Sequence, residues 1–217
     1  MSVNKSNFES IKTQLAEKQV TLVAVSKTKP VSAIQELYNL GQRDFGENYV
    51  QELVDKEALL PKDIRWHFIG HLQTNKVKLI APFVQLIHGV DSLKLLKEIN
   101  KQAEKNNRVI DCLLQIHIAQ EETKFGLNEE ELRSVVKKYE KSEMKNVRVC
   151  GLMGMASFSS DMQKVRKEFE YLKQLFDSVP NLEILSMGMS SDYKTAVEEG
   201  SKMVRIGSLL FGEREKK

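Results

Sequence analysis

Residues 21–30 read TLVAVSKTKP, an aliphatic and β-branched run that passes directly into lysines and a proline. A run of this kind, followed by a turn and an amphipathic helical stretch, is typical of a βα unit in a parallel sheet. The same pattern recurs along the chain. We expect strands at Val20 to Ser26, Asp44 to Glu47, Arg65 to Ile69, Leu86 to Val90, Ile110 to Ile118, Val147 to Met155, Ile184 to Met187 and Met203 to Ile206.

Eight such units in 217 residues leave about 27 residues per unit, near the lower limit for a closed (β/α)₈ barrel. The pattern favours an α/β fold with a single TIM barrel. A doubly wound open sheet would show the same local pattern, and periodicity alone does not separate the two folds.

The segments outside the eight units complete the expected domain. Residues 1–19 are expected to add an N-terminal helix, with Ser6 and Glu9 in capping-box spacing and Phe8, Ile11 and Leu15 on one face. Residues 20–212 form the barrel and 213–217 a charged tail, so that 1–217 is one domain. Two later helices also carry start signals: Asn128 before an acidic first turn, and Ser160 with Gln163.

Composition excludes several classes of protein. Charged residues make up 29% and hydrophobic residues 41%, as in ordinary globular proteins, and the net charge of +3 is dispersed, which argues against nucleic-acid binding. There is no apolar signal segment and no run of roughly 20 apolar residues. Cys112 and Cys150 lie among aliphatic residues and are interpreted as buried thiols. We expect a cytoplasmic protein without a membrane partner.

Lys27 is the first candidate for chemistry. Strand side chains alternate, so Lys27 shares a face with Val23 and Val25. If that face lines a barrel, its amine lies at the carboxyl end of the first strand, where barrel active sites are built. A lysine extending from a strand end into water is the alternative, and Lys29 fits that alternative better.

The last two strands carry further polar residues. Arg205 lies between Val204 and Ile206 in a run that should be buried, so its guanidinium needs a partner. Gly207 and Ser208 follow it. After the seventh strand come Ser190, Ser191 and Asp192, which resemble a helix start, and the loops after strands seven and eight are the usual phosphate position in this fold.

A lysine amine, an arginine at the same mouth and a phosphate cradle opposite are what pyridoxal phosphate requires. The lysine would form a Schiff base with the aldehyde, and desolvation or a nearby cation would lower its pKa enough for attack. An arginine facing the pyridine nitrogen keeps that nitrogen unprotonated, which weakens the ring as an electron sink.

Other motifs are weak or missing. His67 and His71 are four residues apart, but WHFIGH reads as a strand and a turn, so we expect a rim or core role and no metal site. The sequence has no Walker loop, no G-x-G-x-x-G and no G-x-S-x-G. Nucleotide binding and α/β-hydrolase chemistry therefore lack their usual motifs.

Several strings together resemble one family: AVSKTKP (24–30), FGENYVQE (45–52), WHFIGHLQTNK (66–76), TKFG (123–126), GLM (151–153), SMGMSSD (186–192) and MVRIGS with FGER. The chain resembles the pyridoxal phosphate homeostasis proteins over residues 20–214. The resemblance implies a barrel like the N-terminal domain of alanine racemase, with pyridoxal 5'-phosphate bound. By it, the Schiff-base lysine is Lys27, the pyridine-facing residue is Arg205, the phosphate cradle comprises Ser190, Gly207 and Ser208, and the cofactor is also lined by Asn48 and Met187.

The resemblance also bears on activity. Racemases of this fold add a C-terminal β domain that supplies a second acid/base, and we expect no such domain here. The family is held to bind, buffer and deliver the cofactor. We expect a monomer of this kind, with pyridoxal phosphate-dependent apoenzymes as its partners. The alternatives are a low-activity amino-acid racemase and a structural barrel with an incidental Lys27. Lys124, in TKFG, is a rival amine for the cofactor.

Overall fold

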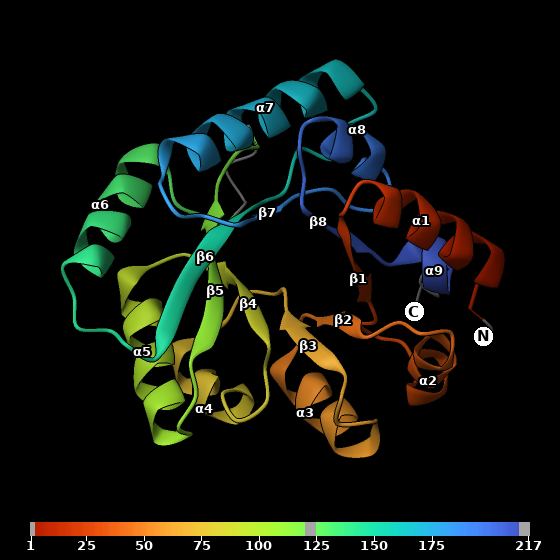
Figure 1. Ribbon diagram of the computed structural model, residues 1–217, viewed down its shortest axis with the longest axis horizontal. Helices are drawn as coiled ribbons and strands as arrows, with labels where there is room; N and C mark the ends of the chain where they lie inside the picture. The colour runs from red at the N-terminus through yellow and green to blue at the C-terminus, as the bar shows by residue number, and fades with distance from the viewer. Residues whose placement is uncertain (1–2, 120–124, 213–217) are drawn as a thin grey trace.

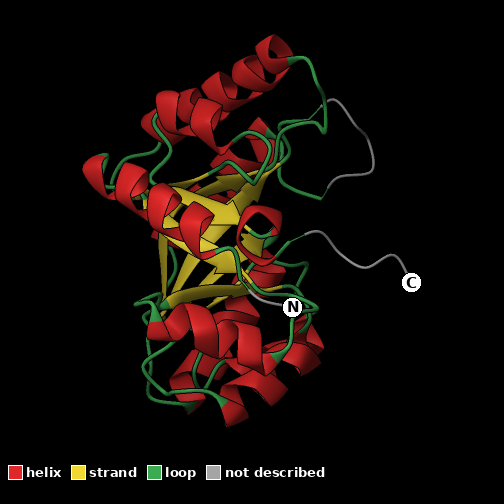
Figure 2. Ribbon diagram, turned by 90° about the vertical axis from the view of Figure 1, so that its right-hand side faces the viewer, coloured by secondary structure: helices red, strands yellow, loops and turns green. Residues whose placement is uncertain are grey.

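The computed structural model describes residues 3–119 and 125–212. Within these ranges the chain folds as a barrel of parallel strands with helices around it (Figures 1 and 2). The strands are β1 (Thr21–Val25), β2 (Asp44–Glu47), β3 (Arg65–Phe68), β4 (Leu86–Val90), β5 (Ile110–Ile116), β6 (Val147–Gly154), β7 (Ile184–Ser186) and β8 (Met203–Ile206). Every expected strand is present, and its bounds differ from the expectation by two residues at most.

The helices lie outside the barrel. They are α1 (Lys5–Glu17), α2 (Val31–Asn39), α3 (Val50–Leu59), the 3₁₀ turn η1 (Thr74–Lys76), α4 (Val77–Ile80), α5 (Leu93–Lys105), α6 (Glu129–Glu140), α7 (Met162–Ser178), α8 (Tyr193–Glu198) and α9 (Ser208–Phe211). None of the helices in the described ranges is long and apolar enough to cross a membrane.

Strand order settles the choice between a barrel and an open sheet. The strands follow one another in sequence order around the barrel, and β8 pairs with β1, which closes it. In that last pairing Val23 lies opposite Arg205. The closure therefore brings the lysine that follows β1 and the arginine of β8 to the same mouth, from opposite ends of the sequence.

Two layers of apolar side chains form the core. The larger one lies between the strands and the helices. A smaller cluster joins Val23, Leu86, Leu113, Cys150, Met153 and Met203, which come from strands that are not all neighbours and therefore meet inside the barrel. Val23 is fully buried there, as the alternation along β1 predicts.

The N-terminal helix α1 packs against α9, the helix that follows β8. Phe8, Ile11 and Leu15 are buried on one face of α1, as expected. The backbone N–H of Asn4 donates to the carbonyl of Leu210 (2.8 Å), so α1 and α9 lie side by side (Figure 1). Two elements from opposite ends of the sequence thus support one side of the barrel mouth.

The helix starts confirm one expectation and correct two. The Asn128 side chain accepts from the backbone of Glu131 in a complete capping box at the start of α6. In α1 the cap is Asn4 instead of Ser6, and in α7 it is Asp161 instead of Ser160. In both cases a neighbouring Asn or Asp supplies the side-chain acceptor for the first free N–H groups.

Candidate functional site

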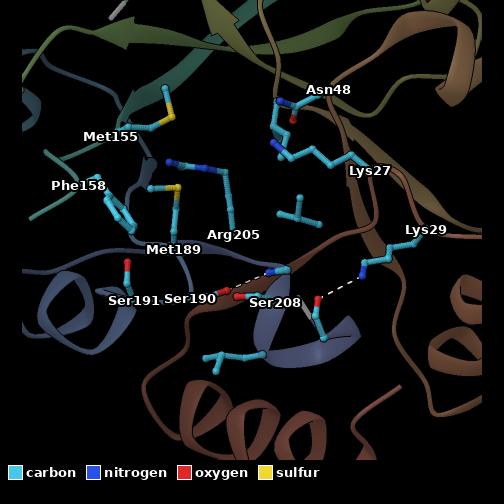
Figure 3. A pocket seen from close by; sticks show the side chains of 15 residues that line it. Lys27, Lys29, Asn48, Met155, Phe158, Met189, Ser190, Ser191, Arg205 and Ser208 are labelled. Atoms are coloured by element: carbon cyan, nitrogen blue, oxygen red, sulfur yellow. Dashed lines mark hydrogen bonds between the residues drawn. The ribbon is translucent and has the colours of Figure 1, made fainter. Parts of the chain in front are cut away.

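A cavity of about 600 Å³ opens at the carboxyl ends of the barrel strands (Figure 3). Residues that follow β1, β7 and β8 supply most of its lining, and the loops after β2, β3 and β6 complete it. Of the seven residues expected at the site, the cavity is lined by Lys27, Asn48, Ser190, Arg205, Gly207 and Ser208. The seventh, Met187, is absent from the cavity wall.

Met187 lies elsewhere because of strand alternation. Ser186 bonds to Arg205 inside the barrel, so the next side chain points outward, and Met187 is fully buried in the larger core. Its neighbour along the loop, Met189, lines the cavity in its place. Side chains alternate along β7, so an inward-pointing Ser186 predicts that Met187 points outward. This alternation could have shown from the sequence that Met187 does not line the cavity.

Lys27 follows β1 on the face predicted for it. Val25, two residues earlier, also lines the cavity, and Lys27 itself is half-buried, with its side chain beside Asn48 (Figure 3). The next residue, Thr28, has a φ of 63°, a conformation that non-glycine residues adopt rarely. Its backbone N–H donates to Oε1 of Glu52 (2.6 Å), which fixes this turn.

A buried ionic cluster supports the lysine loop from behind. Nζ of Lys56 donates to the carbonyl of Ser26 (2.8 Å), to Oε1 of Glu47 (2.8 Å) and to Oε1 of Glu52 (2.6 Å). The Ser26 hydroxyl donates to the same Glu47 oxygen at 2.6 Å. Burial raises the pKa of Glu47, and Lys56 and Ser26 offset this only in part. The cluster therefore joins β1, β2 and α3 directly behind Lys27.

The expectation for Lys29 is wrong. This side chain does not extend into water: it is 8% exposed, and its Nζ donates to the carbonyls of Phe211 (3.0 Å) and Gly212 (3.1 Å). An ammonium that satisfies the last carbonyls of a helix can be buried at little cost. Lys29 therefore ties the lysine loop to the end of α9, a contact between segments 182 positions apart.

Arg205 has the partners that its burial requires. It is 4% exposed, and its Nη1 donates to the Ser186 hydroxyl (2.5 Å) and its Nη2 to the carbonyl of Gly154 (3.0 Å). Burial lowers the pKa of the guanidinium to about 10, so it stays charged at neutral pH. The charge is held at the inner wall of the cavity.

Ser190 and Ser208 lie at one side of the cavity (Figure 3), and Gly207 also lines it. The backbone N–H of Gly207 donates to the Ser190 hydroxyl at 3.2 Å, which joins the loops after β7 and β8. The Asp192 carboxylate accepts from the backbone N–H of Met189 at 2.6 Å and holds the first of these loops. Two hydroxyls thus stand together, opposite the lysine.

The outer wall of the cavity is apolar and open. Met155 and Phe158 line it, and Phe158 is 88% exposed. The loop between them is anchored by Glu168, which accepts from the backbone N–H and the hydroxyl of Ser157 at 2.6 and 2.7 Å. Sequence reasoning did not identify these residues, because helical periodicity does not show which strand-following loop reaches the mouth.

The histidines behave as expected, one in the core and one at the rim. His67 is 3% exposed inside the barrel, while His71 is exposed, stacks on Phe125 and lies 3.3 Å from Asp91. Among residues 3–119 and 125–212, no group of His, Cys, Asp and Glu side chains could hold a metal ion.

The two cysteines are buried, as expected, and burial raises the pKa of Cys150 to about 12. Lys124 and the tail 213–217 lie outside the described residues.

The lining of the cavity suits a phosphorylated aldehyde with an aromatic ring. It offers a primary amine, a buried cation and hydroxyl donors around one space. The buried Oδ1 of Asn48 has no hydrogen-bond partner, although buried polar atoms are nearly always paired. An orphaned polar atom in the wall of a cavity is the kind of group that a bound molecule satisfies.

Comparisons with known proteins identify relatives of this chain in sequence and in fold. The alanine racemase N-terminal domain family matches residues 4–215. The pyridoxal phosphate homeostasis protein of Aquifex aeolicus is 46% identical over 89% of this chain and 87% of its own length, and that of Schizosaccharomyces pombe is 40% identical over 99% and 94%. The structure of PipY from Synechococcus elongatus PCC7942 with pyridoxal phosphate bound superposes with a TM-score of 0.86, at 35% identity over 95% of this chain and 99% of that one. The chain therefore belongs to the alanine racemase N-terminal domain family and, within it, to the pyridoxal phosphate homeostasis proteins.

Proposed function

We propose that this chain binds pyridoxal 5'-phosphate through a Schiff base on Lys27 and serves its homeostasis by holding and releasing it. The observation that carries the proposal is the meeting of Lys27, Arg205 and two serine hydroxyls around one cavity. The names of the relatives and the bound cofactor in PipY support the same ligand.

Each side chain has a separate role in this proposal. When bound, the cofactor supplies an aldehyde that condenses with the Lys27 amine and releases water. Ser190 and Ser208 donate hydroxyl hydrogen bonds to the phosphate, and Gly207 holds Ser190 in place. The buried amide oxygen of Asn48, which can only accept, would take a hydrogen bond from a donor group of the ligand.

Arg205 favours storage over turnover. A guanidinium donates hydrogen bonds and does not accept a proton, so a ring nitrogen that faces it stays unprotonated. An unprotonated ring withdraws electrons poorly, which disfavours reactions at the α-carbon of an amino acid. The buried Ser186 and Gly154 partners keep the guanidinium in this orientation.

Release to pyridoxal phosphate-dependent apoenzymes is the second half of the proposal. Hydrolysis of the Schiff base needs water at Lys27, and the half-buried amine and the exposed Phe158 leave the mouth open to it. The cytoplasmic location and the monomeric state stay predictions.

The test is to map the covalent adduct. Holoprotein reduced with borohydride and digested should carry the cofactor on the peptide that contains Lys27, and Lys27→Ala should abolish the adduct. The matched control is Lys29→Arg, which removes the neighbouring amine and keeps a cation able to donate to the carbonyls of α9. An adduct that maps to Lys124, or that persists in Lys27→Ala, would refute the assignment.

A further inference from the structure

A chain of buried polar side chains crosses the barrel interior below the cavity. The Arg205 guanidinium contacts the Ser186 hydroxyl (2.5 Å), which lies 3.3 Å from Nδ1 of His88. Nε2 of His88 lies 3.0 Å from Nδ1 of His67, and Nε2 of His67 lies 3.1 Å from Oδ1 of Asp44. The chain runs from β8 and β7 across to β4, β3 and β2.

The interior part of the chain is shielded from water. Ser186 and His88 are fully buried and His67 is 3% exposed. They share the barrel interior with aliphatic and sulfur-containing side chains such as Val23 and Met153. Buried polar groups without partners are costly, so each of these side chains depends on the next for its hydrogen bond.

The far end of the chain is an ion pair at the opposite rim of the barrel. Asp44 and Arg65 begin β2 and β3, and Arg65 donates to both Asp44 oxygens at 2.5 and 2.7 Å. Burial opposes ionisation of Asp44, but hydrogen bonds from His67 and Arg65 hold its pKa at about 2. The carboxylate is an acceptor at neutral pH.

The chemistry of the end groups fixes the direction of every bond. Arg205 only donates, so the Ser186 oxygen accepts from it, and the serine hydrogen is left to donate to Nδ1 of His88. His88 is neutral, because burial first, and then the nearby His67 and Arg205, lower its pKa well below its usual value. It therefore carries its hydrogen on Nε2 and donates to His67, which donates from its own Nε2 to Asp44.

We propose that Ser186, His88 and His67 form a one-way relay, with Asp44 as its terminal acceptor, that positions Arg205 in the cofactor site. These are positioning residues, since they act on the ligand only through Arg205. The proposal rests on the proposed function for the role of Arg205. It makes a carboxylate at the far rim of the barrel a determinant of how the cofactor ring is held.

Asp44→Leu tests the relay, because leucine fills a similar volume and offers no acceptor. Without the carboxylate, the hydrogen of His67 is no longer held on Nε2, and His67 and His88 can each exchange between their two tautomers. The Ser186 hydroxyl then loses an acceptor of fixed orientation. Asp44→Asn controls for shape: Oδ1 of Asp44 accepts from both Nε of Arg65 and Nε2 of His67, so an amide oxygen in that position keeps the relay.

The matched control for loss of the ion pair is Asp111→Leu. Asp111 begins β5 and pairs with Arg148 through two bonds of 2.8 Å, at the same rim and in the same geometry as Asp44 with Arg65. Its carboxylate bonds to Arg148, whereas His67 bonds to Asp44. Loss of a rim ion pair alone should affect both variants equally.

Two measurements separate the relay from the cofactor. The first uses the protein without cofactor: nitrogen-15 NMR of the histidine rings should show His88 protonated at Nε2 in the wild type, Asp44→Asn and Asp111→Leu, and as a mixture of tautomers in Asp44→Leu. The second is titration with pyridoxal phosphate, where Asp44→Leu should bind roughly 3- to 10-fold more weakly, the effect of about one net hydrogen bond. Its bound absorption band should also shift, and Asp111→Leu should match the wild type.

The outcomes are decisive in both directions. A single His88 tautomer, protonated at Nε2, in Asp44→Leu, or equal effects of Asp44→Leu and Asp111→Leu on affinity, would overturn the relay. A chain that fails to bind pyridoxal phosphate at all would refute the proposed function, whereas the tautomer measurement would still judge the hydrogen-bond order. Thermal unfolding of both variants shows whether their folds remain comparable.

Discussion

Replacement of Lys56 by methionine should expose how strongly the lysine loop depends on the cluster behind it. The Lys56 side chain is 6% exposed, and the carboxylate of Glu47 beside it is fully buried. The second oxygen of Glu47 has no partner, so Lys56 is the charge that compensates this group. Methionine keeps the apolar stem of Lys56 and removes only its ammonium.

The loss in free energy of unfolding follows from the Glu47 charge that stays buried in Lys56→Met. Removal of one partner of a buried ion pair costs about 3–5 kcal/mol, because the other charge stays buried without compensation. Glu52, on the same ammonium at 2.6 Å, adds repulsion with Glu47 once that ammonium is gone. With a urea m value of about 2.5 kcal/mol/M, the unfolding midpoint should fall by more than about 1 M.

Two further variants make the measurement specific. Lys56→Met with Glu47→Gln removes both charges and should recover much of the lost free energy of unfolding, as a double-mutant cycle would show. Lys173→Met breaks an exposed pair with Asp177 and should cost at most about 0.5 kcal/mol. A loss below about 1 kcal/mol for Lys56→Met, or no recovery in the double variant, would refute the reasoning.

The stability lost in Lys56→Met should increase with pH. The pKa of Glu47 is already raised in the folded chain, and loss of Lys56 should raise it further. A carboxyl with a raised folded pKa favours folding below its unfolded pKa and loses that contribution as the pH rises through the folded value. The deficit of Lys56→Met should therefore be larger at pH 8 than at pH 5.

Three other predictions concern the frame of the site. Gly151→Ala should prevent normal pairing of β6 and β7, since a Cβ there would overlap the carbonyl oxygen of Ile184; a circular dichroism melt like that of the wild type would contradict this. Asp44, with a pKa lowered from 3.8 to about 2, contributes about 2 kcal/mol above pH 4 that is lost as the pH falls toward 2. When the stability of Asp44→Asn is measured as the pH is lowered, this loss should be absent. Lys29→Met should cost about 1–3 kcal/mol by leaving two carbonyls at the end of α9 without their donor, and unchanged hydrogen exchange there would count against it.

The sequence predicted the strands and the position of Lys27 for the same reason. Both depend on local patterns. Runs of β-branched residues indicate the strands, and Lys27 shares the inner face with Val23 and Val25 because side chains alternate along a strand. The count of eight units favoured a closed barrel over an open sheet, and the pairing of β8 with β1 confirmed it. Arg205 could be predicted as buried because it lies between aliphatic residues in a short strand.

The relay and the Lys29 contact depend on distant pairings that local patterns do not encode. His67 and His88 meet only because β3 and β4 are neighbours with a particular register, and Lys29 meets Phe211 only after the barrel closes. The helix caps at Asn4 and Asp161 were missed by one or two residues, since several adjacent polar side chains can serve as the cap.

Barrel closure also determines at which stage of folding the site forms. Lys27 is synthesised long before Arg205, Gly207 and Ser208, and the contact from Lys29 to Phe211 spans 182 positions. Such long-range contacts form late in folding, because loop closure must precede them. A chain with seven units in place would have its lysine but no cavity, so ligand capture would report completion of the last strand.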